Sequence, residues 1–223
     1  LGANTDPYQP VERRLGIARG VLEVLREARH PVVVVTKGLA VLRDVDLLAA
    51  MAEHGLAVVL VSLATLDASL AARMEPRAPP PASRLRVIAG LVAAGVPVGI
   101  LTSPMIPGLN DHEIEALLAA AASHGASRAR YTLLRLPGEV ADLFQEWLRS
   151  HYPDRAERVL SLQRQCRGGK LSDADFGRRM RGEGPLAALI ARRFARACRQ
   201  HGLDRPDWSL DCSLFRPPLG GGG

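Results

Sequence analysis

The amino-acid sequence predicts an α/β fold in which helices cover a parallel β-sheet. Short apolar runs rich in valine alternate with longer segments that carry apolar residues at helical spacing. The runs begin about 25 to 40 residues apart, which leaves room for one crossover helix between neighbouring parallel strands. Polar residues directly follow several of the runs. With 223 residues, the chain is long enough for one sizeable core and a small appendage.

The strand within residues 30–38 (HPVVVVTKG) is the clearest element of this prediction. Its four valines form a short β-branched run of the kind that is buried on both faces of a parallel sheet. The run ends in Thr36 and Lys37, at the carboxyl end of the strand, where parallel α/β folds bind ligands. Lys37 by itself could equally extend into solvent. The recurrence of polar residues at other strand ends favours a binding site.

The segment before this strand is predicted to be a polar turn followed by a helix. Residues 4–10 (NTDPYQP) hold two prolines, which exclude a helix there. Residues 11–28 then show apolar residues at helical spacing. The asparagine, threonine and aspartate of the turn either cap local structure or form a polar cradle at the end of a preceding strand.

The next unit after the central strand repeats the pattern of helix and strand. Residues 42–54 are predicted to be a helix, and residues 57–63 (AVVLVSL) a buried strand with Ser62 near its end. Asp67 is expected to cap a short helix. The proline-rich residues 75–81 form a stiff loop.

The remaining elements of the sheet region are two helices and two strands. They are a helix over 83–94, a strand over 96–101, a helix over 112–123 and a strand over 128–135. Residues 102–111 connect the first of these strands to its helix, and their prolines hold the backbone extended. Asn110 or Asp111 is expected to cap the helix that follows.

The pattern changes after Arg135, which suggests two parts of the chain. Residues 1–138 contain the predicted sheet, and residues 139–223 form a helical extension with an irregular tail. The extension holds an amphipathic helix over 139–151 and arginine-rich helices over 153–165 and 185–201.

The net positive charge of the chain lies in residues 151–223. Residues 1–150 carry 15 basic and 15 acidic residues, whereas residues 151–223 carry 14 basic and 8 acidic ones. This excess is the net charge of +6. A basic surface of this kind is typical of a nucleic-acid partner, and the alternative is a solvated helical surface whose arginines pair with nearby carboxylates.

The three cysteines, Cys166, Cys198 and Cys212, are widely spaced and include no CxxC pair. This spacing indicates neither a disulfide framework nor a local metal site, and we expect reduced cysteines in a cytoplasmic protein. Neither GxGxxG nor GxxxxGK[ST] occurs, so the common nucleotide-binding motifs are absent. No apolar run is long enough to span a membrane.

Several segments together resemble the bacterial radical S-adenosylmethionine (SAM) proteins related to spore photoproduct lyase, a group described as DNA-repair photolyase-like. The segments are NTDPYQPVE, HPVVVVTKG, VLVSLATLD, MEPRAP, PMIPGLNDHEIE, RLPGEVADLF, CRGGK and SLFRPP, and the resemblance covers residues 1–217. It implies a partial (β/α)6 barrel of the TIM-like type. It also implies reductive cleavage of SAM on a [4Fe–4S] cluster, supported by an electron donor, with DNA repair as the setting.

The resemblance assigns five residues to SAM binding. Asn4 and Thr5 match a polar stretch near the methionyl group of SAM, and Lys37 matches a lysine that meets its carboxylate. Ser62 matches a serine near the ribose, and Ile106 an apolar residue near the adenine.

The sequence departs from this group in lacking the CxxxCxxC loop that follows the first barrel strand. Residues 1–3 resemble the end of a strand already in progress, so we expect the sequence to begin within a larger protein, with its first strand and cluster ligands upstream. The chain alone is then expected to be inactive and to expose a sheet edge.

Two other interpretations remain open at this stage. One is a non-catalytic nucleic-acid-binding protein on a decayed barrel. The other is an ordinary α/β-barrel enzyme that uses Lys37 to bind a phosphate or to form a Schiff base.

Overall fold

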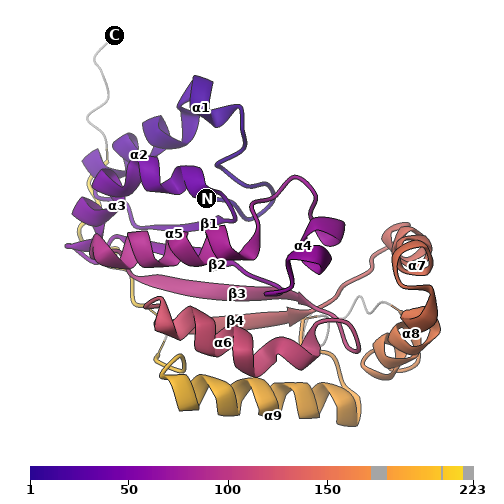
Figure 1. Cartoon of the computed structure of the whole chain (residues 1–223). Coiled ribbons are helices and arrows are strands. Elements are labelled where there is room, and N and C mark those ends of the chain that lie inside the picture. The colour runs from indigo at the N-terminus through magenta and orange to yellow at the C-terminus, as the bar shows by residue number, and fades with distance from the viewer. Residues whose placement is uncertain (172–179, 207, 218–223) are drawn as a thin grey trace.

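The computed structural model describes residues 1–171, 180–206 and 208–217. Four parallel strands form one sheet in the order β1-β2-β3-β4, which is also their order in the chain. These strands are β1 (Val32–Thr36), β2 (Ala57–Ser62), β3 (Val98–Met105) and β4 (Arg128–Leu133). The predicted parallel α/β sheet is confirmed (Figure 1). Its order is consistent with part of a radical SAM barrel.

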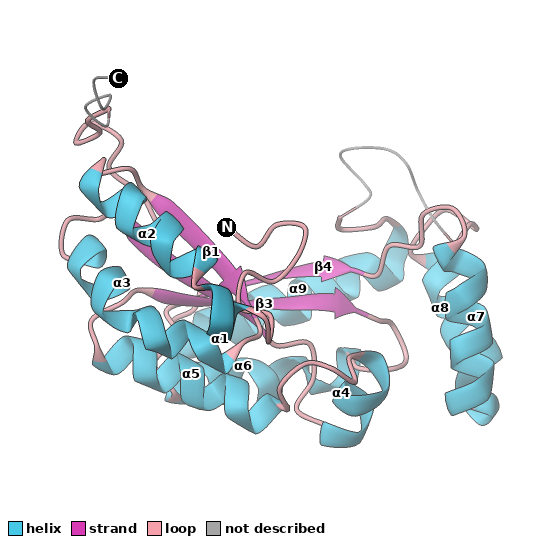
Figure 2. Ribbon diagram, turned by 90° about the horizontal axis from the view of Figure 1, so that it is seen from above, coloured by secondary structure: helices cyan, strands magenta, loops and turns pink. Residues whose placement is uncertain are grey.

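Helices cover one face of the sheet (Figure 2). The covering helices include α2 (Ile17–Glu27), α3 (Val45–Ala52), α5 (Pro81–Ala93) and α6 (Ile114–Ser123). Alternate strand residues such as Val34, Val59 and Ile100 point into this layer and are fully buried. The main core of the molecule therefore lies between the sheet and these helices.

Two predicted helices are each divided in the structure. The helix predicted over 11–28 becomes α1 (Glu12–Leu15) and α2, because Gly16 adopts a left-handed conformation with φ of 64° between them. The helix predicted over 42–54 begins as the 3₁₀ helix η1 (Leu39–Asp44) and continues as α3. Asp67 caps α4 (Ala68–Met74) as predicted, accepting from the backbone N–H groups of the first turn.

The turn after β3 differs from the sequence prediction in two ways. β3 extends through Met105, beyond the predicted end, because Met105 pairs with Leu133 of β4. Asn110 begins the 3₁₀ helix η2 (Asp111–Glu113) without capping it through its side chain. Its side-chain amide oxygen instead accepts from Ile106 N at 2.7 Å, and its amide nitrogen donates to Ala64 O and to Pro104 O of β3.

The C-terminal helices pack against different parts of the sheet region. Helices α7 (Val140–His151), η3 (Pro153–Arg155) and α8 (Ala156–Gln165) lie beyond the carboxyl ends of the strands (Figure 1). α7 and α8 form a second apolar cluster together with Ile106 and Leu134. α9 (Gly184–His201) packs against α6 and contributes to the main core. Residues 172–179, which connect the segment after α8 to the segment before α9, lie outside the described part of the chain.

The first residues of the chain run alongside β1. The nitrogen of Leu1 donates to Val33 O at 2.8 Å, and Val35 N donates to Leu1 O at 2.9 Å. A side chain at Gly2 would meet Val35 O, so only glycine fits this close approach. This pairing agrees with the expected strand end at residues 1–3.

The last described segment crosses the other face of the sheet. Trp208 lies over Gly99, and Asp211 N donates to Gly55 O at 3.2 Å. Arg216 N donates to Ala28 O at 2.8 Å. We call residues 204–206 and 208–216 the C-terminal strap. No helix in the described part of the chain is both long and apolar enough to cross a bilayer.

Candidate functional site

A large cavity lies at the carboxyl end of β1 and has a volume of about 800 Å³. Its walls come from the turn before α1, the end of β1 and the proline-rich loop before α5. The lining residues are Asp6, Tyr8, Gln9, Pro10, Arg13, Lys37, Gly38, Leu39, Ala40, Glu75, Pro76, Arg77, Ala78, Pro79 and Pro80. Charged side chains of both signs therefore face one concave space at the sheet edge where ligands bind in parallel α/β folds.

Asp6 fixes the turn against the end of β1. One carboxylate oxygen accepts from Thr36 Oγ1 at 2.7 Å and from Tyr8 N at 2.9 Å. The other accepts from the backbone N–H of Lys37 at 2.7 Å. Thr36 Oγ1 in turn accepts from Gly38 N at 2.8 Å. These bonds hold the backbone of Lys37 in place at the mouth of the cavity.

Lys37 belongs to a chain of ionic contacts that ends on β2. Its Nζ lies 2.5 Å from Glu75 Oε1, and Arg84 Nη2 lies 2.6 Å from Glu75 Oε2. Arg84 also donates to Ser62 O at 3.0 Å and to Pro79 O at 2.8 Å. Arg84 is almost fully buried, whereas the Lys37 side chain is 37% exposed. A rigid, buried arginine thus positions Glu75, and Glu75 positions the partly exposed ammonium.

The ionisation of Glu75 follows from these contacts. Burial by itself would raise the pKa of Glu75, but the hydrogen bonds and positive charges of Lys37 and Arg84 outweigh it. The pKa of Glu75 is therefore held below its usual value. The carboxylate is charged at neutral pH and forms an ion pair with Lys37.

The other predicted SAM contacts lie at different depths around the carboxyl ends of the strands. Asn4 and Thr5 are exposed on the turn beside β1. Ser62 is half-buried at the end of β2, where Arg84 binds its carbonyl. None of these three residues is among those that line the cavity. The structure brings only Lys37 and Ser62 into one network, through Glu75 and Arg84.

Ile106 lies in the apolar cluster beneath α7 and α8. It is 1% exposed, and its neighbours there include Leu109 and Leu134. Its backbone N–H is held by Asn110. In this conformation Ile106 is a core residue and does not line the cavity beside Lys37.

Sequence reasoning missed Glu75 and Arg84 as members of the site. Residues 75–81 were interpreted only as a stiff loop, and Arg84 only as part of a helix. A signal was present, because Arg84 precedes Val87, Ile88 and Leu91 at spacings of three, four and seven residues. An arginine on the buried face of a helix requires a carboxylate or carbonyl partner.

The described residues do not fit an iron–sulfur cluster. They contain no group of three His, Cys, Asp or Glu side chains placed to hold a metal ion. Cys166 and Cys198 are buried, and burial raises the pKa of each thiol to about 11, whereas cluster ligands are thiolates. Cys212 is exposed and lies on the C-terminal strap.

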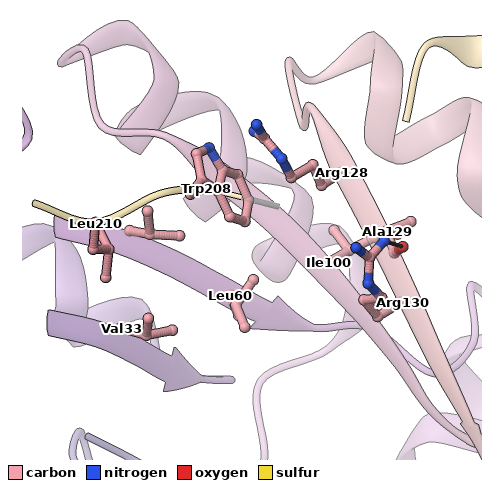
Figure 3. Close-up of a pocket in the computed structure, with 9 residues that line it drawn as sticks. Val33, Leu60, Ile100, Arg128, Ala129, Arg130, Trp208 and Leu210 are labelled. Carbon is pink, nitrogen blue, oxygen red and sulfur yellow. Dashed lines mark hydrogen bonds between the residues drawn. The ribbon is translucent and has the colours of Figure 1, made fainter. Parts of the chain in front are cut away.

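A smaller cavity under the C-terminal strap is apolar and is not a comparable site. It has a volume of about 200 Å³, and Figure 3 shows Trp208 and Leu210 of the strap facing Val33 and Leu60 of the sheet. The Arg128 guanidinium stacks on the Trp208 ring at 3.9 Å from its centroid. This arrangement packs the strap onto the sheet, away from the carboxyl strand ends.

Comparison with known proteins gives one family match. The model of the radical SAM superfamily matches residues 4–121, which include all five predicted SAM contacts. Two similar proteins, from Mycobacterium bovis and Mycobacterium tuberculosis, are both named as uncharacterized. Each is 34% identical over 166 residues, which is 74% of this chain and 49% of the relative.

A further relative is an uncharacterized protein of Acidianus two-tailed virus, 33% identical over 107 residues. That match covers 48% of this chain and 34% of the viral protein. The chain thus spans about half or less of the length of the curated relatives it matches.

Proposed function

The chain belongs to the radical SAM superfamily, and on that premise we propose that the cavity beside Lys37 binds the methionyl end of SAM. Members of this superfamily generally use SAM together with a [4Fe–4S] cluster, which supply radical chemistry. The observation that carries the proposal is the partly exposed Lys37 ammonium, held by Glu75 at the carboxyl end of a parallel strand. Because the described residues offer no cluster ligands, the proposal concerns SAM binding.

The roles proposed for the five residues differ in their support. Lys37 takes the SAM carboxylate, because a compact ammonium at a strand end is a strong partner for it. Asn4 and Thr5 are exposed and available for the methionyl group, and Ser62 for the ribose. Ile106 contacts the adenine only if the second apolar cluster opens, since its side chain is buried.

The substrate is proposed from the finer resemblance. We propose that the chain is related to spore photoproduct lyase, because it resembles that group in its combination of motifs, and we infer a nucleic acid as the substrate class. Support comes from the basic excess of residues 151–223. The whole enzyme would use an external electron donor.

The alternative use of Lys37 as a Schiff-base nucleophile is less well supported. A Schiff base requires a free amine. In the structure the Nζ of Lys37 is instead engaged by the Glu75 carboxylate at 2.5 Å.

SAM binding can be tested by calorimetry with the Lys37→Ala variant. We expect SAM affinity to fall by about 1.5–3 kcal/mol, which is roughly 10- to 150-fold, because a charged hydrogen bond is lost. Binding of 5′-methylthioadenosine should be unaffected, because that compound lacks the methionyl carboxylate. Lys170→Ala, which removes the exposed lysine after α8, is the matched control.

Two results would count against the proposal. One is unchanged SAM affinity in Lys37→Ala. The other is an equal loss for SAM and 5′-methylthioadenosine, which would indicate damage to the whole site.

A further inference from the structure

A second large cavity, of about 670 Å³, lies between the outer edge of β4 and helix α9. Its lining includes Tyr131 of β4, Phe194 and Arg199 of α9, and Arg181 and Arg205 from the segments on either side of α9. We call this cavity the β4–α9 groove. It shares no described lining residue with the cavity beside Lys37.

The groove lies at a gap in the pairing of the β4 edge. At one side Ala129 N donates to Leu203 O at 3.2 Å. At the other side Leu133 N donates to Met180 O at 2.9 Å. Tyr131 lies midway, and its N–H points in the same direction because backbone groups alternate along a strand. Within the described part of the chain, this N–H has no acceptor.

The side chain of Tyr131 is also unsatisfied. Its ring packs against Phe194 with centroids 4.7 Å apart, and its hydroxyl is buried without a hydrogen-bond partner among the described residues. Buried polar groups normally have a partner. The middle of the β4 edge therefore holds two unsatisfied donors, the backbone N–H of Tyr131 and its buried phenol hydroxyl.

The charges around the groove are mostly positive and unpaired. Among the residues that the structure describes, Arg181, Arg199 and Arg205 form no ion pair, and Asp204 is the sole acidic residue in the lining. All three arginines are exposed. Their guanidinium groups are thus available to an anion.

Helix docking does not account for these arginines. Arg193 of α9 does dock the helix, since its Nε and Nη2 contact the two carboxylate oxygens of Glu115 at 2.9 and 2.7 Å. Glu115 belongs to α6, against which α9 packs. Arg199 lies on the same helix yet has no such partner in the described structure. The arginines of this region therefore have two roles. Arg193 holds α9 against α6, whereas Arg181, Arg199 and Arg205 at the groove have no carboxylate partner among the described residues.

We propose that the β4–α9 groove binds the sugar-phosphate backbone of a nucleic acid. Three unpaired guanidinium groups suit phosphate oxygens, which they contact in a bidentate manner. The Tyr131 N–H and hydroxyl add donors of the kind that hold phosphates without reading sequence. The volume of the groove lies within the range of about 300–1,000 Å³ that is typical of ligand sites. The groove is therefore larger than a single phosphate group requires. These observations are independent of SAM binding, whereas the choice of a nucleic acid as the ligand rests on the substrate class proposed above.

Fluorescence anisotropy with a labelled single-stranded oligonucleotide, without SAM, tests this groove. The double variant Arg199→Gln/Arg205→Gln should bind at least about tenfold more weakly than the wild type. The slope of log affinity against log salt should become shallower by about 1.4, since each phosphate contact contributes about 0.7 for single strands. A matched control is Arg26→Gln/Arg155→Gln, which removes two exposed, unpaired charges elsewhere and should change affinity less than about threefold.

Tyr131→Phe separates hydrogen bonding from charge. It keeps the ring against Phe194 but removes the hydroxyl, so affinity should fall by roughly three- to tenfold while the salt slope stays unchanged. Thermal unfolding of each variant confirms that the fold is retained.

Three outcomes would overturn the proposal. The first is no oligonucleotide binding at low salt. The second is an equal loss of affinity in the groove and control double variants, which would indicate attraction to overall charge. The third is arginine-dependent binding to phosphatidylglycerol vesicles without oligonucleotide binding, which would assign the groove to a lipid surface. Loss of SAM binding in Lys37→Ala leaves this test unaffected.

Discussion

Individual side chains at the carboxyl end of β1 form one electrostatic unit. Arg84 is buried and neutralised by Glu75, and Glu75 also holds Lys37. Removing one partner of such a buried pair leaves the other charge uncompensated, which is costly. The unit therefore fixes the loop before α5 against β2 and also presents an ammonium to the cavity. Stability and ligand binding depend on the same three residues.

The contribution of Glu75 to stability should depend on pH. Its pKa in the folded protein is below the unfolded value of 4.5, so its stabilising effect is fully present above that value. The effect should be lost as the pH falls through the lower, folded pKa. We therefore expect Glu75→Gln to lower the free energy of unfolding at pH 7, and the difference from wild type to shrink below about pH 4.

Urea unfolding at several pH values measures this difference. Asp67→Asn provides a comparison, since it alters an exposed cap on α4 outside the network. A stability difference for Glu75→Gln that stays constant between pH 7 and pH 3 would contradict the assigned ion pairs.

At the scale of elements, two glycines differ in whether the packing around them leaves room for a side chain. A Cβ at Gly99 would lie 2.7 Å from the Trp208 ring, closer than side-chain carbons approach one another. Gly20, in the middle of α2, has no atom within 4 Å of the same position. Gly99 is therefore required for the strap to lie on β3, whereas Gly20 is not required for packing.

Alanine substitutions at the two glycines should have opposite effects. Gly20→Ala should stabilise the protein by roughly 0.5–1 kcal/mol, because alanine loses less conformational freedom in a helix. Gly99→Ala should destabilise it and should displace the strap. Urea unfolding gives the stability, and limited proteolysis after residue 204 reports the strap. Equal effects at the two positions would contradict the observed packing of Trp208 on Gly99.

At the scale of the whole molecule, the described residues provide a sheet and a SAM-site candidate without metal ligands. Buried Cys166 and Cys198 lie in the main core, where their protonated thiols act as apolar side chains. Exposed Cys212 lies on the strap. These positions do not form a ligand set.

Iron–sulfur reconstitution of this 223-residue chain should therefore fail. After anaerobic incubation with iron and sulfide, followed by desalting, we expect no stoichiometric broad absorption of a [4Fe–4S] cluster. Triple substitution of the cysteines by serine should leave the spectrum unchanged. Assembly of a full cluster by the wild type, lost in the triple variant, would show that these cysteines are ligands.

The sequence by itself determined the order of elements, the parallel sheet and the position of Lys37 at a strand end. Runs of valine and helical periodicity are local signals, and the carboxyl ends of parallel strands meet at one edge by topology. The cap at Asp67 is likewise local. Helix breaks at Gly16 and before α3 were missed, because a left-handed residue or a 3₁₀ turn is compatible with the same apolar spacing.

Only the tertiary structure decided which distant residues share a site. Lys37 is far from Glu75 and Arg84 in the chain. The sequence shows that a buried arginine on an apolar helix face needs a partner, but it does not show which residue that partner is. The same holds for Tyr131 and Arg199, which line one groove because α9 returns beside β4. Arg193 and Arg199 have the same residue type in one helix, yet one pairs with Glu115 and the other remains free. The number of charged residues can be counted from the sequence. Which charges form ion pairs depends on the distances between them, and these distances are set only by folding.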